Sequence, residues 1–474
     1  MSNKMLFSDD FFYNEVMLDN YFQITKNFDV VNTKFHVADR EAKLYFVDGF
    51  INSETSERVM NFMMSCPKEI KKGMSPEDFV QSVISYIELD ISADMDKIAK
   101  VVYSGAIVMI VNGFSTGFLV KTRAYPKRSV EEPDNDKVLR GAHDGFVESL
   151  LTNTALIRRR IRDRELIIET HEAGKRSRTD IAICYLESKA DPTLLKSLRK
   201  RISEIDVNTL NMSQESLIEC LVKKQIFNPF PKVRYTERPD SAAASIAEGS
   251  VIVIVDNSPA AMIIPTSFFE FLQDTNDYYF PPVVGTYLRF IRGVIFGLAL
   301  LLSPVWYLLI NNPSFIPPWL ECITIKEYYT VPVIAQLLII EMVIDTLKLA
   351  SLNTPNSLSN SFSVIGALVL GDLAVSAELF SSEVVLLMAF VAIANFAQPS
   401  FELGYAFKLS RIFILVSTAV FKLWGFVAGL LIVCLVLAFT KTVSGRGYLY
   451  PLIPFNGKAL SRLLIRHPIS KDNS

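Results

Sequence analysis

The distribution of apolar residues divides the chain into two parts. Gly293–Ile310 is a run of 18 residues without a charge, the lower limit for a helix that crosses a hydrocarbon core of about 30 Å. Between 293 and 440 only 13 of 148 residues are charged, about 9% against 21% for the whole chain. Because charged side chains are costly inside a bilayer, this depletion predicts an α-helical multi-pass transmembrane domain over 286–442, with four to six helices.

The part before it alternates between strand-like and helix-like segments. Ala42–Phe50 has the composition of a strand, and Ser53–Cys66 has an amphipathic helical pattern. Val101–Val120 predicts two apolar strands that form a hairpin around Asn112-Gly113. The first of these strands is apolar on both faces, so we expect it at the centre of a sheet. We assign the strand, helix and hairpin to an α/β lobe over 42–135.

The same order of elements returns later in the chain. Asp180–Ser188 reads as a strand, Thr193–Ile205 as a helix and Glu248–Pro265 as a hairpin. We therefore predict a second, related lobe over 164–285, with two unrelated lobes as the alternative. The alignment pairs Leu44-Tyr45-Phe46 with Ile183-Cys184-Tyr185 at an offset of about 140, and Gly105–Val108 with Gly249–Ile252 at an offset of 144.

Polar segments flank the first lobe. Residues 1–41 are expected to form a partly helical arm, and 136–163 a charged connecting segment. Arg158–Arg160 in this segment could bind a phosphate or a lipid headgroup, or the segment could be a helix face of internal ion pairs. The candidates for gating or for contacts between the lobes are Arg140, Asp144, Glu148, Arg158, Arg159 and Arg160.

Two further candidates lie in a proline-rich stretch of the second lobe. Asn228–Asp240 has prolines at positions 229, 231 and 239, which favour a stiff, extended connection. Tyr235, Glu237 and Arg238 could form a loop that contacts a ligand. Alternatively, Glu237 and Arg238 form an ion pair that locks a structural turn. We keep these two residues as candidates for gating or for contacts between the lobes.

An apolar helix with three charges is predicted in the membrane part. Within Val331–Leu349, Glu341, Asp345 and Lys348 lie on one helix face. A charge at the centre of a bilayer costs at least ~2.5–3.5 kcal/mol, so this face should point at protein or water. The three residues are candidates for an ion pathway. The alternative is an internal Asp345–Lys348 pair, with Glu341 bonded to a neighbouring helix.

A second predicted helix, Phe362–Phe380, is rich in small residues. Small residues allow close packing of helices, and they could also line a narrow pore. The next apolar segment, Val384–Gln398, has only 15 uncharged residues and is expected to be a short or broken span. The candidates for pore lining or helix packing are Val364, Ile365, Gly366, Leu368 and Gly371.

The last apolar segment, Arg411–Thr440, would be about 45 Å long as one helix, too long for one straight crossing. Lys422 and Gly425 could divide it into a hairpin, or its first part could lie in the membrane interface. Lys408 and Arg411 are expected at a cytoplasmic turn. The tail over 443–474 is basic, so we expect an even number of crossings and both termini on the cytoplasmic side.

The composition and the absence of known motifs argue against several classes of function. The net charge of -2 predicts no extended basic surface for nucleic acid. The five cysteines form no CxxC pair, which favours a reducing compartment, and the N-terminus has no signal-peptide pattern. The sequence has no GxSxG, HExxH or P-loop motif, so we expect no enzyme, no cofactor and no metal. The four histidines, which are far apart in the sequence, are His36, His143, His171 and His467.

Several long motifs resemble one family. The segment RGAHDGFVESLLTNTALIRRRI at Arg140–Ile161, with Lys175–Asp180 after it, is similar to the A subunits of GerA-type spore germinant receptors. Asn228–Gly249, Asp277–Arg289 and Tyr450–Pro468 fit the same family, so that the resemblance covers about 42 to 468. The Ser303–Leu320 region and the short arm resemble the branch of stage V sporulation protein AF, with a nutrient-receptor A subunit as the alternative.

The resemblance implies a function in spore germination. It implies a multi-pass protein of the inner spore membrane that contacts lipid and assembles as a homo-oligomer with other germination membrane proteins. Such an oligomer would conduct monovalent ions out of the spore and amplify the response. The alternatives are a non-conducting scaffold that recruits partners through its lobes and a secondary transporter, for which inverted repeats would be expected but are not evident.

Overall fold

The structure is a computed structural model that divides into two units. One unit holds Met1–Lys224 and Val233–Pro265, and the other holds Gln225–Lys232 and Thr266–Ser474. The short segment 225–232 therefore belongs to the second unit, although the chain on both sides of it belongs to the first. The residues described are 6–37, 40–51, 57–58, 60–61, 74–83, 89–120, 141–222, 228–274, 277, 279–325, 331–352, 374–376 and 378–465.

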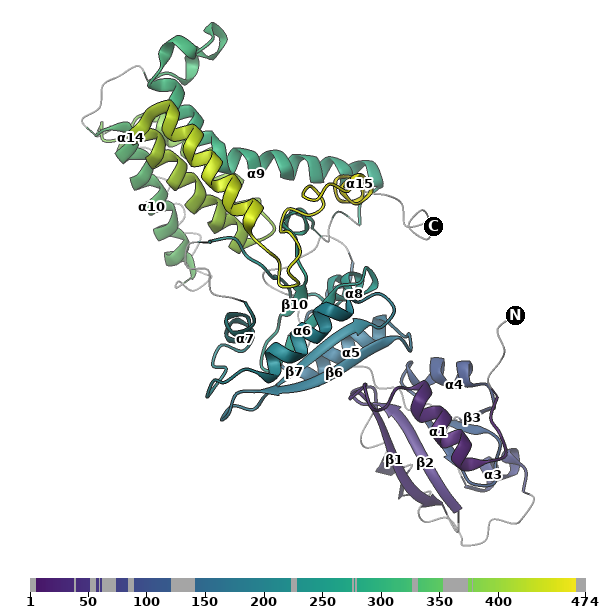
Figure 1. Ribbon diagram of the computed structural model, residues 1–474. Coiled ribbons are helices and arrows are strands. Elements are labelled where there is room, and N and C mark those ends of the chain that lie inside the picture. The colour runs from purple at the N-terminus through teal and green to yellow at the C-terminus, as the bar shows by residue number, and fades with distance from the viewer. Residues whose placement is uncertain are drawn as a thin grey trace. The chain divides into compact units, whose positions relative to one another are not determined.

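The first lobe is a five-stranded antiparallel sheet with the order β1-β2-β4-β5-β3 (Figure 1). Successive residues of β2 point to opposite faces, so that Tyr45 packs with α1 and α4 while Leu44 packs with Phe79 and Phe118. Every residue of β4 is buried, as predicted for a central strand. The elements are α1 (Phe11–Tyr21), β1 (Val30–Val37), β2 (Arg40–Val47), α3 (Pro76–Val83), β3 (Leu89–Ser92), α4 (Met95–Val102), β4 (Ile107–Val111) and β5 (Gly117–Val120).

Two boundaries of this lobe differ from the sequence prediction. Strand β1 begins at Val30, inside the segment expected as an N-terminal arm, and pairs along its whole length with β2. Its middle residues are polar and partly exposed, so the sequence shows no clear alternation of apolar and polar positions there. The hairpin prediction started too early, because Val101 and Val102 end α4 and β4 begins at Ile107. The hairpin itself is confirmed, with Gly113 at φ +90° in the turn between β4 and β5.

The second lobe is a five-stranded antiparallel sheet with the order β6-β7-β9-β10-β8. Helices α5 and α8 pack on β7 and on each other. Buried residues of α5, among them Leu156 and Ile157, join the apolar core of this sheet. The elements are α5 (Leu150–Arg160), β6 (Leu166–Ala173), β7 (Thr179–Leu186), α6 (Pro192–Ser203), α7 (Ser213–Leu221), β8 (Arg234–Thr236), α8 (Pro239–Ala247), β9 (Val251–Val255) and β10 (Ala261–Ile264).

The two sheets repeat one topology. Their strand orders are equivalent. In each sheet the two arms of the apolar hairpin, β4 and β5 in the first lobe and β9 and β10 in the second, occupy the third and fourth positions. Tyr45 of β2 pairs with Val108 of β4, and Cys184 of β7 pairs with Ile252 of β9. These are the residues that the sequence alignment places in equivalent positions, so the pairing register is the same in both lobes.

The second unit is helical. Among the residues that the structure describes, α9 and α14 are long and apolar enough to cross a membrane by length and composition, and α13 is a shorter apolar helix. Proline 304 lies inside α9. The elements are η1 (Phe268–Leu272), α9 (Pro282–Ile310), η3 (Pro313–Phe315), η4 (Pro318–Ile323), α10 (Val333–Leu352), α12 (Ala374–Ser376), α13 (Ser382–Phe396), α14 (Phe401–Phe439) and α15 (Gly457–Leu464).

Helix α14 is interrupted at Lys422, whose backbone is non-helical at φ 54° and ψ -133°. A side chain at Gly425 would meet the carbonyl oxygen of Ser417, and one at Gly429 would meet the Cα of Ile414. The segment after Lys422 therefore folds back antiparallel on the segment before it. Of the two arrangements predicted for this segment, the hairpin divided at Lys422 and Gly425 is therefore the one observed. Gly425 and Gly429 allow its two arms to pack closely.

Candidate functional site

Four charged side chains meet between α10 and α14. Arg411 donates through Nε to Glu341 Oε1 at 2.7 Å, and Lys408 Nζ lies 3.2 Å from Glu341 Oε2 and 2.5 Å from Asp345 Oδ1. Arg411 also donates to the carbonyl oxygen of Ala299 in α9. Three of the four are buried, and Asp345 is about one third exposed. We call these four residues the α10–α14 charge cluster.

The spacing on each helix brings the charges together. Glu341 and Asp345 are four residues apart on α10, and Lys408 and Arg411 are three apart on α14, so each pair shares one helix face. Two carboxylates thus oppose two cations. Since the cost of removing a charge from water is offset by close counter-charges, each of these buried charges depends on its partners across the helix pair.

The positions of Lys408 and Arg411 correct the sequence prediction, which placed them at a cytoplasmic turn. Both lie inside α14, with less than a tenth of their surface exposed. Two features of the sequence could have indicated their burial. Lys408 and Arg411 are three residues apart in an apolar segment, and Glu341 and Asp345 on another apolar helix require cationic partners. Pairing between segments about 70 residues apart cannot be read from either segment alone.

Lys348, the third candidate on α10, lies over aromatic rings. Its Nζ is 4.5 Å from the centre of the Phe396 ring and 5.4 Å from that of Tyr405. A cation over a ring face is attracted to its π electrons. This contact connects α10 with α13 and α14. The remaining candidates of the helical part, Val364, Ile365, Gly366, Leu368 and Gly371, lie outside the described residues, as does Arg140.

Arg158, from the predicted charged segment, is fully buried between the two lobes of the first unit. Its Nε donates to Asp29 Oδ2 at 2.7 Å, and its Nη1 donates to the carbonyl oxygen of Leu166 at 2.9 Å. The ring of Tyr103 lies 5.1 Å from its guanidinium carbon. Arg158 therefore links the lobes through an internal ion pair and does not present its charge to an external phosphate.

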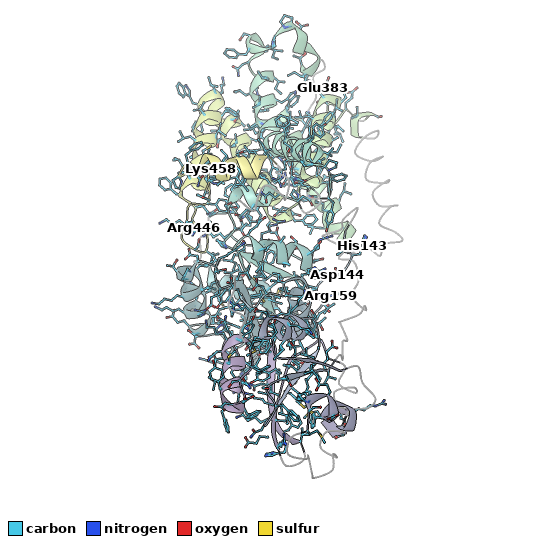
Figure 2. All side chains as sticks on the ribbon, turned by 90° about the vertical axis from the view of Figure 1, so that its right-hand side faces the viewer. His143, Asp144, Arg159, Glu383, Arg446 and Lys458 are labelled. Carbon is cyan, nitrogen blue, oxygen red and sulfur yellow. The ribbon has the colours of Figure 1, made fainter. Side chains whose placement is uncertain are left out.

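The other charged candidates have separate partners. Arg160 pairs with Asp144, with Nη2 2.7 Å from Oδ2. Figure 2 labels Asp144 and Arg159 near one edge of this unit. The backbone carbonyl of Glu148 accepts from Asn257, and that of Glu237 accepts from Phe146. Among the described candidates, Arg158 thus links the two lobes, whereas Asp144 and Arg160 pair with each other.

Arg238 is buried at the start of α8. Its Nε donates to Asp240 Oδ1 at 3.0 Å, and its Nη2 lies 2.5 Å from Asp240 Oδ2. Pro239 occupies the first turn of the helix, where a proline needs no hydrogen-bond donor. The pairing with Asp240, two residues later, gives Arg238 a structural role in this turn. The sequence had proposed Glu237 as its partner.

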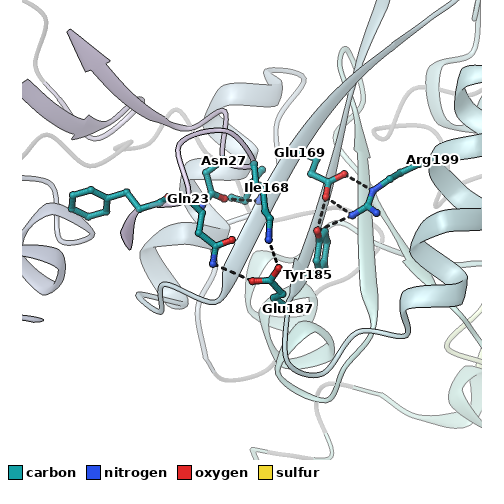
Figure 3. Close-up of polar contacts among 9 residues, drawn as sticks. Gln23, Asn27, Ile168, Glu169, Tyr185, Glu187 and Arg199 are labelled. Atoms are coloured by element: carbon teal, nitrogen blue, oxygen red, sulfur yellow. Dashed lines mark hydrogen bonds and ion pairs between the residues drawn. The ribbon is translucent and has the colours of Figure 1, made fainter. Parts of the chain in front are cut away.

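A polar cavity of about 700 Å³ lies where the Ile24–Phe28 turn meets β6, β7 and α6 within the first unit. Figure 3 shows the contacts: Asn27 accepts from the backbone of Ile168, and Gln23 donates to Glu187. Burial alone would raise the pKa of Glu169, but hydrogen bonds with His171, Arg199 and Tyr185 lower it to about 2. Sequence reasoning missed this cluster because its residues are scattered over four elements.

The described residues contain no group of three side chains suited to hold a metal ion. The chain is similar over 455 residues to stage V sporulation protein AF of Bacillus subtilis (strain 168), with 38% identity, covering 96% of this chain and 92% of the relative. It is also similar to spore germination protein B1 of the same organism, with 27% identity over 94% of this chain and 92% of that one.

Among solved structures, the N-terminal domain of the A subunit of the Bacillus megaterium spore germinant receptor GerK3 aligns with a TM-score of 0.43 and 21% identity, covering 55% of this chain and 96% of that domain. The model of the family described as Bacillus/Clostridium GerA spore germination protein matches residues 17–474. The chain therefore belongs to the GerA family of spore germination proteins.

Proposed function

We propose that this protein is a multi-pass subunit of a germination complex in the inner spore membrane, with both termini on the cytoplasmic side. Its helical unit would assemble with further copies into a conduit for monovalent ions, and ion release through it would amplify germination. Membership of the GerA family and the two long apolar helices support the membrane location. The α10–α14 charge cluster is the observation that carries the proposal of conduction.

The cluster suits a closed ion pathway. Charged groups inside apolar helices are costly and often mark ion routes. In the cluster each carboxylate already has a cationic partner, so a permeating cation would have to displace Lys408 or Arg411 before it could bind Glu341 or Asp345. Separation of α10 from α14 would expose two carboxylates. We infer that the described arrangement corresponds to a non-conducting state.

The test is ion flux through the purified protein in liposomes. Gly366→Leu and Gly371→Leu should abolish flux if the small-residue segment lines the conduit, with oligomer size unchanged. Gly293→Leu is the matched control, because open space surrounds Gly293 within the chain. Absence of flux from a correctly folded oligomer of the parent chain would reject conduction by this protein alone.

A second set of variants tests the cluster. Glu341→Gln combined with Arg411→Met removes one buried pair without leaving a lone charge, so it should fold better than either single change. Altered ion selectivity or conductance in this double variant, or in Asp345→Asn, is the expected result. Unchanged conductance and selectivity in both would exclude Glu341 and Asp345 from the pathway.

A scaffold is the second candidate function, and one surface of the first unit favours it. Helix α1 exposes Phe12, Tyr13 and Val16, each by more than half of its surface. Contiguous exposed apolar side chains mark protein interaction sites. If Phe12→Ser with Val16→Ser abolished co-purification of other germination proteins from spores while flux in liposomes was unchanged, recruitment would be a separate function of the α/β unit.

A further inference from the structure

The segment after α14 holds apolar side chains in an exposed turn. Leu452, Ile453 and Phe455 follow one another with only Pro454 between the last two, and Phe455 is 73% exposed. The turn is ordered by backbone hydrogen bonds from Ile453 to Leu449 at 3.1 Å and from Asn456 to Pro451 at 2.8 Å. The backbone of the turn therefore has a defined conformation, and its apolar side chains are exposed in that conformation. We call Leu452–Phe455 the apolar turn.

Both sides of the apolar turn are attached to the helical unit. Before it, Tyr448 is buried and donates through its hydroxyl to the carbonyl oxygen of Pro231 at 2.7 Å. After it, Asn456 caps α15 by accepting from Ala459, and Arg289 of α9 donates to the carbonyl oxygen of Leu463 at 3.0 Å. These contacts fix both ends of the turn within the helical unit.

Basic residues lie on both sides of the apolar turn in the sequence. Lys441, Arg446 and Lys458 are exposed, and Figure 2 shows Arg446 and Lys458 on one side of the helical unit, whereas Glu383 lies on the other. Helix α15 is amphipathic, with Leu460, Leu463 and Leu464 on one face and Lys458 on the opposite face. Exposed apolar residues next to basic residues are the pattern of a segment that lies in a membrane interface.

We propose that the apolar turn and α15 bind the surface of an anionic membrane. Leu452, Ile453 and Phe455 would enter the boundary between headgroups and acyl chains, while Lys441, Arg446 and Lys458 contact anionic headgroups. The charge complementarity and the continuity with Phe439, which is exposed at the end of apolar α14, favour lipid over a protein partner. The proposal rests on the proposed membrane location of the helical unit.

A tryptophan in the turn tests this surface. Phe455→Trp in the full chain, reconstituted in vesicles of phosphatidylcholine with or without phosphatidylglycerol, adds a signal to the three native tryptophans. We expect lipids brominated near the headgroup to quench the added emission, and more strongly when phosphatidylglycerol is present. Lys441→Gln with Lys458→Gln should reduce this quenching to the level found in phosphatidylcholine alone.

Two controls separate the possible failures. Trp424 is 79% exposed on α14, so quenching of the parent chain by lipids brominated deep in the acyl chain reports insertion of the helical unit itself. The second control, Met212→Trp, places the added tryptophan in the first unit, at a residue whose exposed fraction equals that of Phe455. If the parent chain is quenched but the emission added by Phe455→Trp is not, the lipid-binding turn is rejected. A blue shift of the added emission without quenching, because a second copy covers the turn, rejects it as well. If the parent chain is not quenched, the membrane location fails instead.

Discussion

Arg411 and Glu341 form an ion pair in which both side chains are buried and the residues are 70 positions apart in the sequence. Two nitrogens of the guanidinium approach one carboxylate oxygen, Nε at 2.7 Å and Nη2 at 2.6 Å. Lys408 contacts the other carboxylate oxygen of Glu341. Glu341 is thus the counter-charge of two cations, Lys408 and Arg411.

Replacement of Glu341 by Gln should strongly destabilise the helical unit. The change leaves Arg411 buried without its counter-charge, which typically costs about 3–5 kcal/mol. Thermal unfolding in detergent measures the loss. Asp345→Asn is the control, because Asp345 is more exposed and Lys408 keeps its contact with Glu341 in that variant. Equal, small shifts for both variants would contradict the burial of the Arg411–Glu341 pair.

The hairpin in α14 predicts different results for two glycines. Gly425→Ala should destabilise the helical unit, because the new Cβ would lie 1.9 Å from the carbonyl oxygen of Ser417. Gly293→Ala meets open space in α9 and should stabilise the helix by roughly 0.5–1 kcal/mol, since alanine restricts the unfolded chain. Melting temperatures in detergent compare the two. If both alanines were tolerated equally, the two arms of α14 would not pack at Gly425.

Lys422→Gly should stabilise the same hairpin. The backbone of Lys422 has a conformation that glycine adopts readily but a residue with a side chain adopts at a cost of about 1–3 kcal/mol. The greater backbone freedom of glycine in the unfolded chain offsets part of the gain, so a net increase of about 1 kcal/mol is expected. A decrease in melting temperature would indicate that α14 continues as one helix through this position.

The first unit should lose stability in acid through Glu169. The pKa of this group is lowered to about 2 in the folded chain, from 4.5. A lowered pKa contributes stability that is complete above about pH 4.5 and is lost as the pH falls toward 2, on the order of 2 kcal/mol. Glu169→Gln should remove this part of the pH dependence. Glu172→Gln, an exposed neighbour on β6, should leave it unchanged in unfolding titrations between pH 2 and 6.

Local patterns predicted much of the α/β unit because the hairpins are local. Asn112-Gly113 supplies the turn that joins two fully buried strands, and the equivalence of Tyr45 with Cys184 correctly anticipated a common pairing register. Strand β1 was missed because an edge strand with polar residues lacks a strong apolar period. Its identity as a strand depends on pairing with β2.

The charge cluster could be predicted only in part. Three acidic and basic residues in one apolar helix indicated a polar face, but the sequence did not identify which cations meet Glu341. Lys408 and Arg411 resemble the basic residues of a cytoplasmic turn when their segment is considered alone. Their burial depends on the packing of α14 against α9 and α10, which brings in partners from distant parts of the chain.

The assignment of 225–232 to the helical unit affects how the protein can be divided for experiments. Within that unit Phe230 is buried beside Phe407 and Tyr448, and Asn228 donates to the hydroxyl of Thr440 at 2.7 Å. A recombinant fragment that stops at Pro265 would retain this loop but lose every one of these partners. The Phe230 side chain would then be exposed to water, so an excised α/β fragment should be more soluble with Phe230→Ser.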